Sequence, residues 1–247
     1  MDLQKIDIFI PYSNVEGWFS LRNVPNVNAD GGIPGLNCGF NTEAPDRETE
    51  SNRGQLFNEL GLDGERVAFV RQVHGSTVLE VSGGGRFGEA DAMVTETIGL
   101  TLAIQVADCA AVLLADPESD VIGAVHAGWR GALDGVLPNT VQKMMRLASA
   151  RPDRMIAYIS PSICQKHFEV GEEVASRFPE PYVDRERFSK PHVDLKGYLH
   201  RQLINEGIPE NQVEVAPDCT MENEELYYSY RRDGKKAGRM LSLIRLN

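Results

Sequence analysis

The sequence predicts a fold of the α/β (α+β) class in which central mixed β-sheets are flanked by helices. Strand-like runs rich in β-branched residues alternate with amphipathic helical segments along the chain. No glycine-rich dinucleotide motif follows the first strand, and the elements lack the regular eightfold alternation of a barrel. The length of 247 residues suits one α/β domain, and no internal repeat divides it. We therefore expect residues 1–247 to form a single domain.

The first half of the chain predicts a long loop followed by a helix and several strands. Residues 23–55 are rich in Asn, Gly, Pro, Asp and Glu, which is typical of an ordered functional loop. A helix is expected to start around Ser51–Leu60. Three strand-like stretches follow, each broken or ended by a short turn of small residues: Arg66–Val81, Leu100–Pro117 and Val121–Gly131.

The second half predicts helices interleaved with further strands. Residues 131–150 read as a helix that is kinked at Pro138 or begins there. Its apolar face is expected to hold Val141, Met144, Met145 and Ala148. Two more amphipathic helices are expected at 169–178 and 193–208, the second ending at Gly207, and strands are expected at 154–160, 213–220 and 238–246.

Charge and hydrophobicity limit the partners that the chain can have. The formal net charge is −11, with no basic stripe, so neither nucleic acid nor an anionic membrane surface is an expected partner. No window is apolar for long enough to span a membrane, and the first residues lack a signal-peptide pattern. We expect a cytoplasmic protein, whose oligomeric state the sequence does not indicate.

Three residues at the ends of strand-like runs are candidate metal ligands: His74, Cys109 and His126. Each is followed at once by Gly or Ala, which lets the backbone turn and leaves room beside the ligand atom. Two imidazoles and a thiolate suit zinc, and three protein ligands leave a fourth position open, as in catalytic sites. The alternative is that these are ordinary core residues, since no short ligand motif joins them.

The other cysteines give no further ligand motif. Cys38, Cys164 and Cys219 form no C-x-x-C pair with one another or with Cys109, which disfavours a zinc finger of the cysteine-only type. Cys164 and Cys219 have no evident nearby partner, and we expect both to be structural.

Polar residues beside the three ligand candidates could serve a reaction. Asp108 precedes Cys109 and could orient a ligand or bind substrate, or simply form a turn. Arg130 precedes an apparent helix and could hold an anion, or form a surface salt bridge. Gln72 shares a strand face with His74 and could reach the same cleft. The segment 227–233, Tyr-Tyr-Ser-Tyr-Arg-Arg-Asp, could wall a nucleobase pocket or form an aromatic edge strand.

These segments together resemble a known family over nearly the whole chain. The resemblance is carried by RQVHGSTV, ADAMVTETIGLTLAIQVADCAAVLLADP, GAVHAGWRGAL, SPSICQKHFEVGEEV and DCT…YYSYRRDGKKAGRMLSLI. The family is that of the laccase-domain proteins or multicopper polyphenol oxidoreductases, later described as purine nucleoside phosphorylases with adenosine deaminase activity. The stretch from Leu36 to Arg53 is similar to the family's Leu-Asn-x-Gly…Asn-Arg pattern.

The resemblance implies a zinc site at His74, Cys109 and His126 and a fold similar to the catalytic domain of cytotoxic necrotizing factors. It implies phosphorolysis of adenosine, inosine, guanosine and S-methyl-5′-thioadenosine, and hydrolytic deamination of adenosine. Purine nucleosides and phosphate would be the partners, with Asn37, Arg53 and Gln72 as binding residues. The chain departs from the family at residues 22–32, at Ser160 and at Ala110-Ala111. The first departure weakens the assignment of the substrate loop.

Catalytic roles are less defined than the metal ligands. Asp108 and Arg130 are the candidate catalytic residues, with Asp108 or Glu169 as the proton carrier and Arg130 or Arg53 as the phosphate ligand. The His-x-Glu motif of other zinc deaminases is absent.

Other functions remain open as alternatives. A copper-dependent polyphenol oxidase is one, although five histidines are too few for several copper centres. A metal-free amidase with Cys109 as nucleophile and His126 as base is another, but it leaves His74 without a role. The dense polar content at the strand ends disfavours a non-catalytic binding module.

Overall fold

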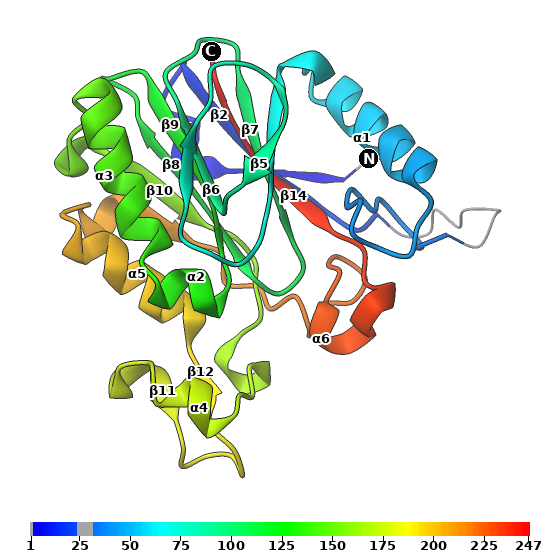
Figure 1. Ribbon diagram of the computed structural model, residues 1–247, viewed down its shortest axis with the longest axis vertical. Coiled ribbons are helices and arrows are strands. Elements are labelled where there is room, and N and C mark those ends of the chain that lie inside the picture. The colour runs from blue at the N-terminus through cyan, green and yellow to red at the C-terminus, as the bar shows by residue number, and fades with distance from the viewer. Residues whose placement is uncertain (1, 24–31) are drawn as a thin grey trace.

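Two six-stranded mixed sheets pack face to face in this computed structural model, which describes residues 2–23 and 32–247 (Figure 1). The first sheet has the order β1 (Leu3–Lys5), β2 (Val15–Ser20), β14 (Met240–Leu246), β7 (Thr101–Val106), β3 (Val67–Arg71) and β5 (Gly85–Glu89). The second has the order β13 (Val213–Val215), β10 (Ile156–Ile159), β8 (Ala110–Asp116), β9 (Val121–Ala127), β6 (Ala92–Thr95) and β4 (Val78–Glu80). Each sheet contains both parallel and antiparallel pairs.

Helices cover the outer faces of both sheets, giving four layers. Helix α1 (Asp46–Glu59) lies over the first sheet, and α3 (Val136–Ala148) and α5 (Leu195–Asn205) lie over the second (Figure 1). The shorter helices are α2 (Trp129–Leu133), α4 (Glu172–Ala175) and α6 (Tyr230–Asp233). The small pair β11 (Val183–Asp184) and β12 (His192–Val193) projects with α4 below the main body. None of the helices in the described parts is long and apolar enough to cross a membrane.

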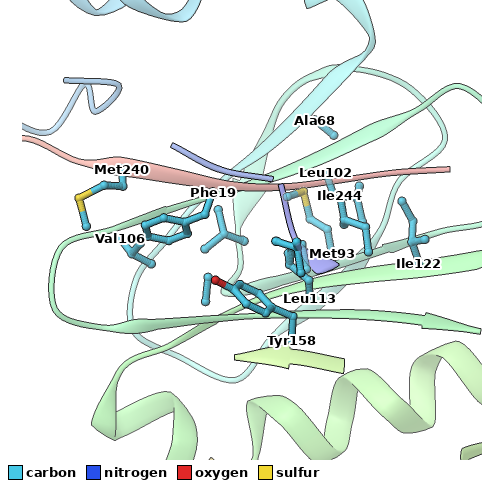
Figure 2. Packing of buried hydrophobic residues seen from close by; sticks show 14 of the residues in the cluster. Phe19, Ala68, Met93, Leu102, Val106, Leu113, Ile122, Tyr158, Met240 and Ile244 are labelled. Carbon is cyan, nitrogen blue, oxygen red and sulfur yellow. The ribbon is translucent and has the colours of Figure 1, made fainter. Parts of the chain in front are cut away.

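The central core lies between the two sheets. Phe19 and Ile244 of the first sheet meet Leu113 and Tyr158 of the second there, all at most 1% exposed (Figure 2). Strands β8 and β9 are buried along their whole length, because one face meets the other sheet and the opposite face meets the helices. Uninterrupted apolar runs are what such doubly covered strands require.

The register between β8 and β9 prepares the site. Ala111 pairs with His126, and Ala110 pairs with Ala127, at the end of this antiparallel hairpin. Cys109 therefore comes next to the end of β9, beside His126. A slip of one residue would turn the imidazole to the opposite face of the sheet.

The predicted class, α/β with mixed sheets flanked by helices, is confirmed, as are the strands in the three stretches 66–81, 100–117 and 121–131. Strands β1, β2, β5 and β6 were not predicted. Helix α1 begins at Asp46, before the expected start, and residues 24–31 of the expected loop lie outside the described residues. The expected helix at 169–178 is a single turn, and the aromatic segment near 230 forms a helical turn, not an edge strand.

Helix α3 corrects two details of the predicted helix. It begins at Val136, and Pro138 occupies its first turn, where a missing N–H breaks no helical hydrogen bond. Met144 is fully buried, but Met145 is 41% exposed, so it does not belong to the apolar face.

The two adjacent methionines of α3 give a matched test of the packing. Met144→Ala should lower the free energy of unfolding by about 2–5 kcal/mol, because it leaves a cavity above β9 near Gly123. Met145→Ala should change it by no more than about 0.5 kcal/mol. Urea unfolding of both variants measures the difference. Equal losses would contradict the orientation of this helix.

Candidate metal centre

His74, Cys109 and His126 form a ligand triad at one end of the sheet sandwich. Their donor atoms all lie within 4.8 Å of one another. His74 lies in the loop after β3, Cys109 immediately precedes β8, and His126 is on β9. The two imidazole rings meet edge to face, with centroids 4.8 Å apart. Three donors so close, from three separate segments, can hold one metal ion.

A buried carboxylate, Asp91, holds two members of the triad in place. Its Oδ1 accepts a hydrogen bond of 2.7 Å from His126 Nδ1, which leaves Nε2 for a metal. The same carboxylate accepts backbone N–H bonds from Val73, His74 and Gly75 at 3.2, 2.9 and 2.6 Å. Burial alone would raise the pKa of Asp91, but these hydrogen bonds outweigh it and lower the pKa.

The backbone near the triad has two residues with positive φ angles and a glycine in close contact with the ligands. His74 and Asp108 have φ angles of +61° and +84°, in the left-handed region that disfavours residues with a Cβ atom. Gly128 lies against two ligands, since a Cβ there would come within 3.0 Å of Cys109 Sγ and 3.1 Å of His74 Cδ2. Gly128, which follows His126 and Ala127, thus leaves room for the ligand atoms, as the sequence indicated.

The triad favours a thiolate and an imidazolium. Burial alone would raise the pKa of Cys109, but His126 and His74 outweigh it and lower the pKa to about 6. Burial would lower the pKa of His126, but Cys109 and Asp91 raise it to about 9. An ionised sulfur is the form that binds a metal or attacks an electrophile.

The triad opens into a cavity of about 480 Å³. Part of its lining is apolar and aromatic: Trp129, Ile163, Phe168, Leu195 and Tyr230. The lining also carries polar groups: Asn41, Gln72, Gln105, Asp108, Arg231 and Arg239. A volume in this range, with an apolar lining and a few polar groups, is typical of small-molecule sites.

Two residues predicted for the site, Asp108 and Gln72, line this cavity and also brace it. Asp108 Oδ1 accepts from Thr220 Oγ1 at 2.6 Å, and its Oδ2 accepts from the backbone N–H of Arg231 at 2.6 Å. Gln72 exchanges two hydrogen bonds with the backbone of Gln105, at 2.8 and 2.9 Å. Both side chains therefore fix neighbouring segments of the wall.

Arg130 and Glu169 do not line the cavity. Arg130 is exposed, and its guanidinium lies 4.2 Å from the centre of the Trp129 ring. The carboxylate of Glu169 pairs with Lys190 on the surface, at 2.6 Å.

Asn37 and Arg53 lie deeper in the molecule. Asn37 is fully buried, and its Oδ1 accepts backbone bonds from Gly39 and Arg239. Arg53 donates from Nε to the carbonyl of Cys38 and stacks on Phe69 at 4.0 Å. Burial lowers the pKa of Arg53 to about 10, with Cys38 opposing and Arg86 adding to the effect.

Sequence reasoning missed Asp91 and Arg239. Arg239 is half-buried in the cavity wall, where burial lowers the pKa of its guanidinium and the nearby Cys109, Tyr230 and Asp108 oppose that effect. Asp91 lies in the Ala-Asp-Ala-Met segment and Arg239 in the Gly-Arg-Met segment, both among those quoted for the resemblance. A single acid before a strand gives no periodic signal, so its position in the fold is what identifies it.

Comparison with known proteins supports the resemblance. The family model described as "Multi-copper polyphenol oxidoreductase laccase" matches residues 25–247. A purine nucleoside phosphorylase of Deinococcus radiodurans is 41% identical over 219 residues, which cover 87% of this chain and 84% of that protein. Adenosine deaminase RL5, from an unknown prokaryotic organism, is 28% identical over 262 residues, which cover 99% of this chain and 98% of that protein. The crystal structure of YlmD from Geobacillus stearothermophilus has a TM-score of 0.89 at 26% identity, covering 96% of this chain and 94% of that one.

Asp91 offers a test of the triad. Asp91→Asn should weaken metal binding by about 10- to 100-fold, because the neutral amide orients and polarises His126 less well. Competition with a chromogenic chelator measures the affinity, and the melting temperature reports on folding. An unchanged metal affinity in the folded variant would exclude this role of Asp91.

Proposed function

The chain belongs to the multi-copper polyphenol oxidoreductase laccase family, and on that premise we propose that it is a zinc-dependent purine nucleoside enzyme. It would catalyse phosphorolysis of adenosine, inosine, guanosine and S-methyl-5′-thioadenosine, and hydrolytic deamination of adenosine. The observation that carries the proposal is the opening of the triad into a cavity with an aromatic wall and two arginines. Relatives named purine nucleoside phosphorylase and adenosine deaminase support the substrate class.

The donor set fits zinc. The thiol of Cys109 has a lowered pKa, so metal binding would mainly displace the proton of the His126 imidazolium, and Asp91 already orients that ring. Zinc bound there would supply a Lewis acid and lower the pKa of a water molecule at the end of the cavity. His74 and His126 would each offer a ring nitrogen, Nε2 in the case of His126, and Cys109 would offer its sulfur, which would leave one of four coordination positions for a water molecule.

The cavity walls fit the two parts of the substrates. The rings of Trp129, Phe168 and Tyr230 offer faces and edges for a purine base, which is planar and aromatic. Arg231 and Arg239 also line the cavity and offer positive charge for phosphate. The cavity would therefore bind base and anion together, with the glycosidic bond between them.

Asp108 is our candidate for the proton carrier. Among the described residues that line the cavity, it is the one carboxylate. Its hydrogen bonds to Thr220 and Arg231 hold it rigidly beside Cys109, so any proton it moves would follow a fixed path. Glu169 is the weaker candidate because its carboxylate pairs with Lys190.

A metal-free amidase is the second candidate function. The thiolate of Cys109 lies beside the imidazolium of His126, which the carboxylate of Asp91 orients in turn. Cysteine hydrolases use the same arrangement of nucleophile, base and orienting group. His74 has no role in that chemistry, which is why zinc ranks first. Copper is an alternative metal, because the family description names it and a His₂Cys set can bind it.

Product analysis tests the reaction directly. Zinc-loaded protein incubated with adenosine and phosphate should release adenine and ribose 1-phosphate, or inosine and ammonia. Chelation or Cys109→Ala should abolish both, since each removes the metal. Failure of zinc-replete protein to consume any of the four nucleosides would refute the proposal. Amide hydrolysis that survives chelation would favour the amidase.

Substitution of two arginines tests whether Arg239 or Arg130 binds the phosphate. Arg239→Met should raise the KM for phosphate by about 10- to 100-fold, since a hydrogen bond to a charged group contributes about 1.5–3 kcal/mol. Arg130→Ala should raise it less, because that guanidinium stacks on Trp129 and Arg130 does not line the cavity. Steady-state kinetics at saturating nucleoside measure both. The reverse order would assign the anion to Arg130, as the sequence predicted.

A further inference from the structure

A second group of potential metal ligands lies outside the triad. Donor atoms of Cys164, His167 and Glu222 all lie within 4.8 Å of one another. The sulfur of Cys219 lies beside this group, where it accepts a hydrogen bond from the backbone N–H of Cys164 at 3.2 Å, but it is more than 4.8 Å from at least one of the three donors. The expectation that these two cysteines have no nearby partner was wrong: they are 55 residues apart in sequence and adjacent in the structure.

The four residues come as two pairs with the same spacing. Cys164 directly precedes the 3₁₀ turn Gln165–His167, and His167 is its last residue. Cys219 and Glu222 are likewise three positions apart. An isolated parallel bridge between Ser162 and Cys219 holds the two segments together. Two ligands separated by two residues, repeated on two adjoining segments, is the pattern of structural zinc sites.

We propose that Cys164, His167, Cys219 and Glu222 bind a second divalent ion of the zinc class, with a structural role. Four protein donors can close a tetrahedral shell, which leaves no position for a substrate. The N–H bond to the Cys219 sulfur is the kind of backbone support that metal-bound sulfur receives. This site is separate from the triad and does not depend on the proposed reaction.

A surface ion pair is the competing explanation. Glu222 Oε1 lies 2.8 Å from Lys166 Nζ and 3.0 Å from His167 Nε2. Exposed pairs of this kind stabilise a protein only weakly, and this one does not account for two adjacent sulfurs.

The second site would brace the wall of the main cavity. Ile163 and Phe168, on either side of the Cys164–His167 pair, line that cavity. Arg231 donates to the carbonyl of His167 at 3.1 Å, and Thr220, beside Cys219, donates to Asp108. An ion bound there would therefore fix two segments that shape the substrate site without touching the substrate.

Cobalt binding to Cys109→Ala protein tests the proposal. This variant lacks the sulfur of the triad, so any thiolate-to-cobalt charge-transfer absorption must come from another cysteine. We expect a band that saturates at about one equivalent of cobalt(II), and about one retained zinc per chain by elemental analysis. Adding Cys164→Ser and Cys219→Ser together should abolish the band, and adding His167→Ala should weaken cobalt binding by at least about tenfold.

Lys166→Ala in the Cys109→Ala background is the matched control. It removes the ion-pair partner of Glu222 and leaves all four donors, so cobalt binding should persist. Circular dichroism confirms that each variant is folded. A folded Cys109→Ala protein without a thiolate–cobalt band would overturn the proposal. A band that survives Cys164→Ser and Cys219→Ser together would also overturn it, because the sulfur would then lie elsewhere.

Discussion

The carboxylate of Asp91 is the constraint on which the site depends. A buried charge is costly unless hydrogen bonds compensate it, and Asp91 receives them from one imidazole and three successive backbone N–H groups. The N–H groups belong to the loop that carries His74, and the imidazole belongs to β9. One side chain thereby sets the distance between two ligands that arise from different strands.

The pairing and packing of the two sheets position the third ligand, Cys109, and enclose the cavity. Strands β8 and β9 pair so that Cys109 and His126 become neighbours, and both strands are buried on both faces. The first sheet contributes Gln72 after β3 and Gln105 on β7, which are joined by reciprocal hydrogen bonds at the cavity. The cavity thus spans the ends of both sheets, and neither sheet alone would enclose it.

Local patterns predicted much of this arrangement. The turn residues after His74 and His126 and before Ala110 marked where strands begin and end, and those ends converge. The buried strands β8 and β9 were evident as apolar runs because both of their faces are covered. Strand β5 was not evident, since its residues are mostly exposed and include two glycines.

Long-range pairing is what the sequence could not supply. The proximity of Cys164 to Cys219, of Arg239 to Cys109 and of Asp91 to His126 depends on which strands become neighbours in the sheets. No local periodicity encodes that order. The exposure of Met145 beside buried Met144 depends in the same way on the rotation of α3 against its sheet.

The separation of the triad along the chain has a consequence for biosynthesis. Its members lie on three segments with β4 to β8 between the first and the last, and no short stretch contains two of them. On a ribosome that adds about 5–20 residues per second, His126 is made roughly 3–10 s after His74. Asp91 and Cys109 are made in between, and the hairpin that aligns Cys109 with His126 closes only when β9 is complete. The site therefore cannot assemble early on the nascent chain, and Cys109 remains without its two histidine neighbours until the second sheet has formed.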